Sequence, residues 1–157
     1  MARLFFEDQK IYSAYFDHLK AVLKEYGKEN KIKGGIKLYS PDEINNSITQ
    51  FPCVSFEIFG QQTNSNATDF IDIEYLSRFS VEINVYTSGL KRYENCLNIC
   101  NRVIRALQEK MELGDYITRG LIVVEKTRTP SLNEDICRFT ARLTGVCDNA
   151  NKIILPR

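Results

Sequence analysis

Eight consecutive residues in the middle of the chain, 78–85, alternate strictly between polar and apolar side chains. The apolar members are Phe79, Val81, Ile83 and Val85, and the polar members are Arg78, Ser80, Glu82 and Asn84. Successive side chains of a β-strand point to opposite faces of its sheet, so this alternation predicts a strand with one buried and one exposed face. The chain is therefore expected to fold around a sheet that is covered on one side.

Two segments have the spacing of amphipathic helices. The first spans about residues 8–26 and ends at Gly27, and its apolar stripe consists of Ile11, Tyr15, Leu19, Val22 and Tyr26. The second spans about residues 90–111, with Ser88 as its expected N-cap and Gly114 as its expected stop. Its predicted core stripe consists of Tyr93, Leu97, Cys100, Ile104, Leu107 and Met111.

Three further segments have the composition of strands, and they complete the predicted fold. They cover residues 51–59, about 121–129 and 137–143, whereas the polar and small residues 60–68 predict a flexible connection. The inward residues of the last strand are expected to be Cys137, Phe139, Ala141 and Leu143. The resulting order α-β-β-α-β-β predicts an α+β fold, in which two main helices pack on one face of a four-stranded, mainly antiparallel sheet.

The length of 157 residues favours a single domain, 1–157. We expect its core within residues 8–147 and a C-terminal tail at 148–157. The tail contains an apolar patch, residues 153–155, for which docking on the domain and docking on a neighbour both remain open.

The composition of the chain and its N-terminus argue against several classes of protein. With 21 Lys and Arg against 20 Asp and Glu, the net charge of +1 gives no bulk electrostatic reason for nucleic-acid binding. No apolar run approaches the ~20 residues that cross a membrane. The N-terminus becomes acidic too early for a secretory signal, so we expect a cytoplasmic protein whose five cysteines are mostly buried and reduced.

The sequence contains no recognisable catalytic or metal-binding set. The single histidine, His18, is expected to be an ordinary helix residue, and one histidine without a CxxC pair cannot build the usual structural zinc site. Asp69, Asp72 and Glu74 cluster, but a solvated strand edge explains them better than a catalytic carboxylate pair. We therefore predict no enzyme, no catalytic residues, no metal and no cofactor.

Two groups of residues are candidates for contacts between subunits. Arg128 and Arg138 are expected to flank the turn that begins at Pro130, with Arg142 further along the same face as Arg138. These arginines are either the exposed face of a sheet or a surface for assembly, where Arg is favoured over Lys. Asp69, Phe70 and Ile71 lie beside the polar connection and form a second candidate, with the two apolar residues as an anchor.

The order of these elements resembles that of the tail terminator or tail-completion proteins of tailed bacteriophages. The likeness covers roughly residues 8–147. It includes the leading helix, the strand entry at residues 51–54, the strand that ends at residues 85–87, the helix that closes with residues 104–107, and the last strand at residues 137–143. The segment 31–47 departs from the pattern, which leaves another phage neck protein as an alternative.

The resemblance implies a structural virion protein of the tail or neck that assembles in the host cytoplasm. Such a subunit forms a ring, commonly a hexamer, that terminates the tail tube and joins it to the head–neck connector. Its partners would be further copies, the tail tube protein and the connector protein, while DNA passes through the lumen without specific binding. A ferredoxin-like module that binds a small ligand or RNA is the alternative from another class, although Phe79 and Phe139 are expected to be buried rather than available for stacking on bases.

Overall fold

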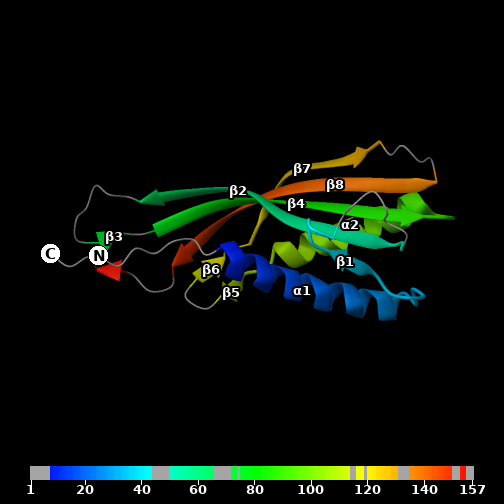
Figure 1. The fold of residues 1–157 in the computed structure, drawn as a ribbon, viewed down its shortest axis with the longest axis horizontal. Coiled ribbons are helices and arrows are strands. Elements are labelled where there is room, and N and C mark those ends of the chain that lie inside the picture. The colour runs from blue at the N-terminus through cyan, green and yellow to red at the C-terminus, as the bar shows by residue number, and fades with distance from the viewer. Residues whose placement is uncertain are drawn as a thin grey trace.

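The protein consists of a long mixed β-sheet with both helices on one of its faces (Figure 1). The computed structural model describes residues 8–43, 50–65, 72–73, 75–113, 116–118, 120–130, 135–149 and 153–154. In chain order the elements are α1 (Asp8–Glu29), β1 (Lys37–Tyr39), β2 (Cys53–Ser65), β3 (Asp72–Ile73), β4 (Tyr75–Ser88), α2 (Arg92–Leu107), β5 (Met111–Leu113), β6 (Tyr116–Thr118), β7 (Ile122–Thr129), β8 (Ile136–Asn149) and β9 (Ile153–Ile154).

The strand β4 lies at the centre of the main sheet. It pairs antiparallel with β2 on one side and with β8 on the other, and β1 continues the sheet beyond β2. Two strands pair with the other edge of β8: β7 pairs with its residues 138–144, and β6 pairs with its residues 147–149. A separate two-stranded sheet joins β3 to β9, so residues 153–154 of the predicted C-terminal tail pair within the chain.

The predicted α+β class and its two main helices are confirmed, but the prediction of four mainly antiparallel strands is wrong. The sheet is mixed, since β1 runs parallel to β2, and the short strands β5 and β6 extend it to seven. Strands of three residues are too short to carry a recognisable alternation.

The predicted flexible connection at residues 60–68 is also wrong where the structure describes it. Residues 60–65 belong to β2 and pair with residues 75–80 of β4. A bulge between Ile58 and Gly60 separates this polar extension from the apolar half of the strand. Backbone hydrogen bonds hold the extension in the sheet, and these bonds do not require apolar side chains.

The second helix differs from its prediction at both ends. Ser88 is the last residue of β4 rather than an N-cap, and the helix begins after Gly89 and Lys91, whose φ angles are +82° and +57°. Left-handed conformations cannot be part of an α-helix, so these residues fix its start. The helix ends at Leu107 and β5 follows it, well before Gly114.

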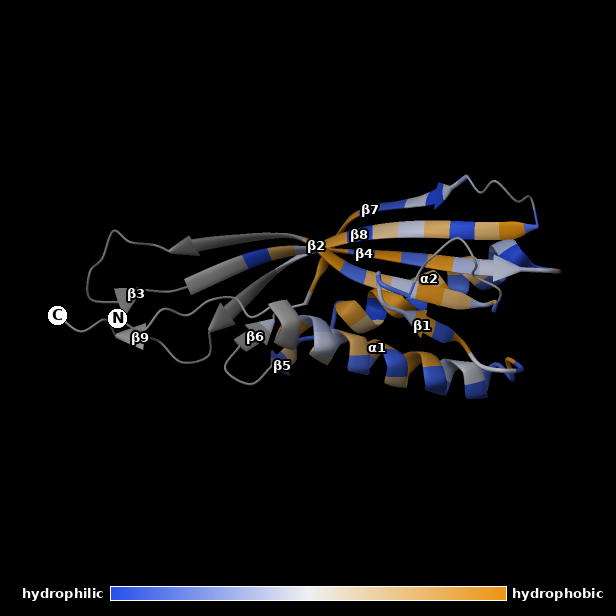
Figure 2. Ribbon diagram, viewed as in Figure 1, coloured by the Kyte–Doolittle hydropathy of each residue, from blue (hydrophilic) through white to orange (hydrophobic). Residues whose placement is uncertain are grey.

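The core lies between the helices and the inner face of the sheet. Figure 2 shows apolar residues recurring along both helices and along β4 and β8. The predicted inward residues of β4 and β8 are confirmed as buried, as are Ile11, Tyr15 and Leu19 of α1. The stripe predicted for α2 is partly wrong, because Tyr93 is 50% exposed. The residues of α2 that are buried are Cys96, Ile99, Cys100, Val103, Ile104, Ala106 and Leu107.

Four cysteines, Cys53, Cys96, Cys100 and Cys137, are buried and free, as predicted. The fifth, Cys147, has its side chain outside the described residues. Burial raises the pKa of the Cys53 and Cys96 thiols to about 12 and that of Cys100 to about 11. The thiols therefore remain neutral in the folded protein well above the pH at which an exposed cysteine ionises.

This difference predicts a loss of stability in alkali. In the unfolded chain the thiols ionise near pH 8.5. A folded-state pKa above that value stabilises the fold fully at lower pH, and this contribution is lost as the pH rises from about 9 to about 12. We expect the free energy of unfolding in urea to be insensitive to these thiols up to about pH 8 and to fall above it. The Cys100→Ala variant should show a shallower fall than the wild type, and identical profiles would contradict the prediction.

Candidate assembly surface

The face of the sheet that points away from the helices carries a network of interacting polar side chains. We call this surface the outer face and define it by the alternate residues of three neighbouring strands. They are Glu82, Asn84 and Tyr86 of β4, Arg138, Thr140 and Arg142 of β8, and Thr129 of β7. We add Phe59 from the bulge in β2, because its ring lies beside Arg142. Those of β4 and β8 each lie one position away from a core residue in the strand, so the alternation that buries one face creates the other.

Asn84 is the centre of a hydrogen-bond network on the outer face. Its Oδ1 atom accepts hydrogen bonds from Arg138 Nε at 3.1 Å, from Arg138 Nη2 at 2.9 Å and from Thr140 Oγ1 at 2.6 Å. The Thr140 hydroxyl also lies 2.6 Å from that of Thr129. Asn84 is only 6% exposed, so the network joins β4, β8 and β7 through a buried amide.

A second group extends the network toward the bulge in β2. The Asn84 amide donates to Glu82 Oε1 at 3.2 Å, and Arg142 Nε lies 3.4 Å from Glu82 Oε2. The Arg142 guanidinium also lies over the ring of Phe59, 5.6 Å from its centroid. Phe59 is the extra residue of the bulge, and its side chain is 51% exposed. Bulges re-aim side chains, and this one places an exposed aromatic ring beside an arginine.

Arg138 is held from two sides, whereas Arg142 is more open. The Arg138 guanidinium lies 5.3 Å from the centroid of Tyr86, in addition to its bonds to Asn84. Burial raises the pKa of Tyr86, and the nearby Arg138 opposes part of that rise. The Arg142 side chain is 51% exposed while its partner Glu82 is 16% exposed. Arg142 and Phe59 are thus the parts of the outer face that are available to a second molecule.

The structure does not place Arg128 with the other two arginines. Arg128 is paired with Phe139, so its side chain is on the helix side of the sheet, where its guanidinium lies 5.2 Å from the ring centroid of Tyr93. Its neighbour Lys126 donates to Asn101 of α2 on the same side. The register pairs Thr129 with Arg138, and a shift of one residue along a strand moves a side chain to the opposite face.

The other predicted contact residues, Asp69, Phe70 and Ile71, lie outside the described residues. The strands that lead to them are described, since Ser65 at the end of β2 pairs with Tyr75 at the start of β4.

Sequence reasoning missed Asn84, Tyr86 and Phe59 as members of the outer face. Asn84 had been identified only as an exposed-face residue of its strand. A register between the strands at residues 78–85 and 137–143 would have placed it beside Arg138 and Thr140.

We found no metal-binding cluster in the part of the chain that the structure describes. No group of three or more His, Cys, Asp and Glu side chains there could hold a metal ion. His18 Nε2 lies 3.2 Å from Glu109 Oε2, which places the histidine in a contact between α1 and the segment after α2. No helix among the described residues is long and apolar enough to span a membrane.

Comparison with solved structures gives a distant likeness of fold. No protein-family model and no curated protein matches the sequence. A chain in a solved structure described as the virion of the native gene transfer agent (GTA) particle matches with a TM-score of 0.50 and 14% identity. The match covers 83% of this chain and 84% of that chain. The two chains therefore share an α+β fold over most of their lengths.

Proposed function

We propose that this protein is a structural component of a phage-like virion, and more specifically the ring subunit that terminates a tail tube and joins it to the head–neck connector. The observation that carries the proposal is the fold shared with a chain of a virion particle over most of both chains. The order of elements, which resembles that of phage tail terminators, supports the finer assignment.

The outer face is the surface that we assign to contacts between neighbouring copies. It combines a half-exposed arginine and an exposed aromatic ring, and the pairing with Thr144 places the exposed Ile122 of β7 (69%) on the same side of the sheet. Arginine and aromatic residues are enriched in protein interfaces. In a ring each subunit contacts the next through two different patches, and the rotation between subunits closes after a fixed number of copies, which we expect to be six.

The purified protein is expected to form rings. Size-exclusion chromatography with light scattering gives the mass of the assembly, and negative-stain microscopy shows its shape. Assembly on purified tail tubes is the second measurement, because some rings form only on a tube end. Binding to tube ends with an open lumen supports the terminator, whereas a protein that is monomeric alone and absent from the tubes would contradict the proposal. Binding only to a connector would indicate another neck protein.

Replacing Arg142 with alanine tests the role of the outer face. The Arg142 side chain is half exposed in its ion pair with Glu82, so its loss should lower the free energy of unfolding by less than about 1 kcal/mol. The concentration needed for ring formation should nevertheless rise by about tenfold. The control is Arg105→Ala, an exposed arginine on α2. Equal assembly of the two variants would show that the outer face is not an interface.

A further inference from the structure

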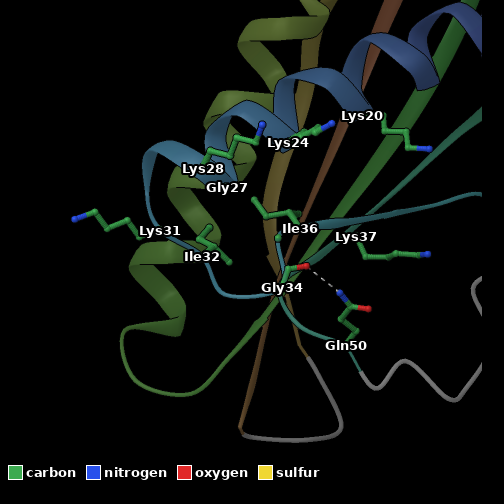
Figure 3. A pocket seen from close by; sticks show the side chains of 11 residues that line it. Lys20, Lys24, Gly27, Lys28, Lys31, Ile32, Gly34, Ile36, Lys37 and Gln50 are labelled. Carbon is green, nitrogen blue, oxygen red and sulfur yellow. Dashed lines mark hydrogen bonds between the residues drawn. The ribbon is translucent and has the colours of Figure 1, made fainter.

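A cleft at the end of α1 is lined by lysines and lies apart from the outer face. Figure 3 shows the cleft between the last turns of α1 and the segment that leads into β1. Its volume is about 460 Å³. The lysines that line it are Lys20, Lys24, Lys28, Lys31 and Lys37.

The charge of the cleft is not compensated by its own lining. None of the described residues that line it is an aspartate or a glutamate, and all five lysines are exposed. Three of them, Lys20, Lys24 and Lys28, recur every four residues and therefore form one stripe along α1. This stripe spans about 12 Å. Such a row of like charges favours an anionic partner of at least that length.

The remaining lining of the cleft is apolar or lacks side chains. Ile32 and Ile36 contribute half-buried apolar groups, while Gly34 and Gly35 have φ angles of +82° and +71° and open space where a side chain would lie. A partner that fits this lining has acidic groups separated by apolar ones. A nucleic-acid backbone matches the charge of the cleft but not the isoleucines.

The chain itself contains a segment with this chemistry. Residues 69–74 read Asp-Phe-Ile-Asp-Ile-Glu, which is three acids separated by three apolar residues, without Lys or Arg. Asp72 and Ile73 form β3, which pairs along one edge with Ile153 and Ile154 of β9, so this part of the segment is already extended. When bound in a fully extended conformation, the segment would span up to about 18 Å between Asp69 and Glu74, enough to follow the lysine stripe.

The strand β3, which is the described part of the segment, and the cleft of one subunit lie far apart. The end of β2 and the start of β4, which lead to the segment, lie at one end of the long axis of the molecule, whereas the end of α1 and β1 lie toward the other (Figure 1). Only a second copy can bring the two together. We infer that the acidic segment 69–74 of one subunit binds in the lysine cleft of the next.

This contact is heterologous, so it joins subunits head to tail as a ring requires. The inference rests on the proposed function for its setting, and it adds a named pair of surfaces to the ring.

Reversing the charges on each side tests the contact. Lys24→Glu with Lys28→Glu is expected to raise the concentration needed for ring formation by about tenfold or more, and adding Asp69→Lys and Asp72→Lys to that variant should restore assembly. The control is Arg105→Glu with Lys110→Glu, which makes the same change of charge at exposed residues outside the cleft. Circular dichroism and thermal melting verify that each variant folds. Rings that form equally well with the reversed cleft would overturn the inference but leave the proposed function intact.

A direct binding measurement keeps the test independent of assembly. The probe is a fluorescein-labelled peptide of residues 66–75, and the receptor is the full chain with Asp69→Asn, Asp72→Asn and Glu74→Gln, whose own segment cannot compete by charge. Fluorescence anisotropy should detect binding that weakens with added salt and falls by about tenfold with Lys24→Glu and Lys28→Glu. The inference would be overturned if the peptide did not bind, or if a 20-nucleotide single-stranded DNA bound through the same lysines while the peptide did not.

Discussion

Replacing Gly120 with alanine is expected to lower the free energy of unfolding by about 3 kcal/mol, which corresponds to a fall in melting temperature of roughly 6–12 °C. Two independent features cause this loss. Gly120 has a φ angle of +98°, a conformation that residues with a side chain rarely adopt. A Cβ atom there would also overlap the carbonyl oxygen of Gln108 and lie 3.0 Å from its carbonyl carbon.

The overlap involves the backbone at the end of α2, so it cannot be relieved by turning a side chain. The chain passes close to α2 at this point, and the Leu121 N–H donates to the carbonyl oxygen of Leu107 at 3.0 Å. Moving Gly120 away would weaken this bond and shift Leu121, which is 3% exposed, out of the core.

Gly89→Ala is the matched control for this prediction. Gly89 has a φ angle of +82°, but open space surrounds the position of its missing Cβ. That substitution adds conformational strain without a clash, and it should cost about 1–2 kcal/mol. Thermal melting by circular dichroism compares the two variants. Equal losses would mean that the close approach to Gln108 contributes nothing.

The parts of the fold that the sequence predicts are those with local and strict patterns. The alternation at residues 78–85 and the inward set of β8 identify buried faces without knowledge of any partner strand, because a strand presents alternate residues to each side. The stripe at Ile11, Tyr15 and Leu19 likewise needs only the helical repeat. All of these residues are buried.

The errors arise where the structure depends on a turn or on a pairing between strands. The face of Arg128 depends on the register across the turn that follows Pro130, and a one-residue difference there decides whether it joins Arg138 or Tyr93. The stripe of α2 depends on where the helix begins, and the left-handed residues Gly89 and Lys91 set that point. The extension of β2 depends on β4 as a partner for residues 60–65.

The outer face was predictable only in part for the same reason. Arg138 and Arg142 were identified from their own strand. Asn84, which holds Arg138 in place, is 54 residues away from it in the sequence. No local pattern distinguishes a buried amide with four hydrogen-bond contacts from an exposed one in the same strand.

The replacement of Asn84 is the second change for which we expect a large effect. Asn84→Ala should lower the free energy of unfolding by about 2–3 kcal/mol, because it removes the acceptor for Arg138 and Thr140 in a site that water barely reaches. Urea denaturation measures the change. Ser80→Ala, on the same strand and face, is the control and should change stability by less than about 0.5 kcal/mol.

A double-mutant cycle separates the bond from the loss of packing. If Asn84 acts by orienting Arg138, then Asn84→Ala and Arg138→Ala should each be destabilising, but together they should cost about 0.5–3 kcal/mol less than the sum of their separate effects. Additive losses would indicate that the two side chains stabilise the sheet independently. Because Arg138 and Arg142 share the outer face, Asn84→Ala should also weaken ring formation, whereas the control Ser80→Ala should not. If the Asn84→Ala variant melts at a lower temperature yet forms rings like the wild type, the network stabilises the sheet but does not contribute to assembly.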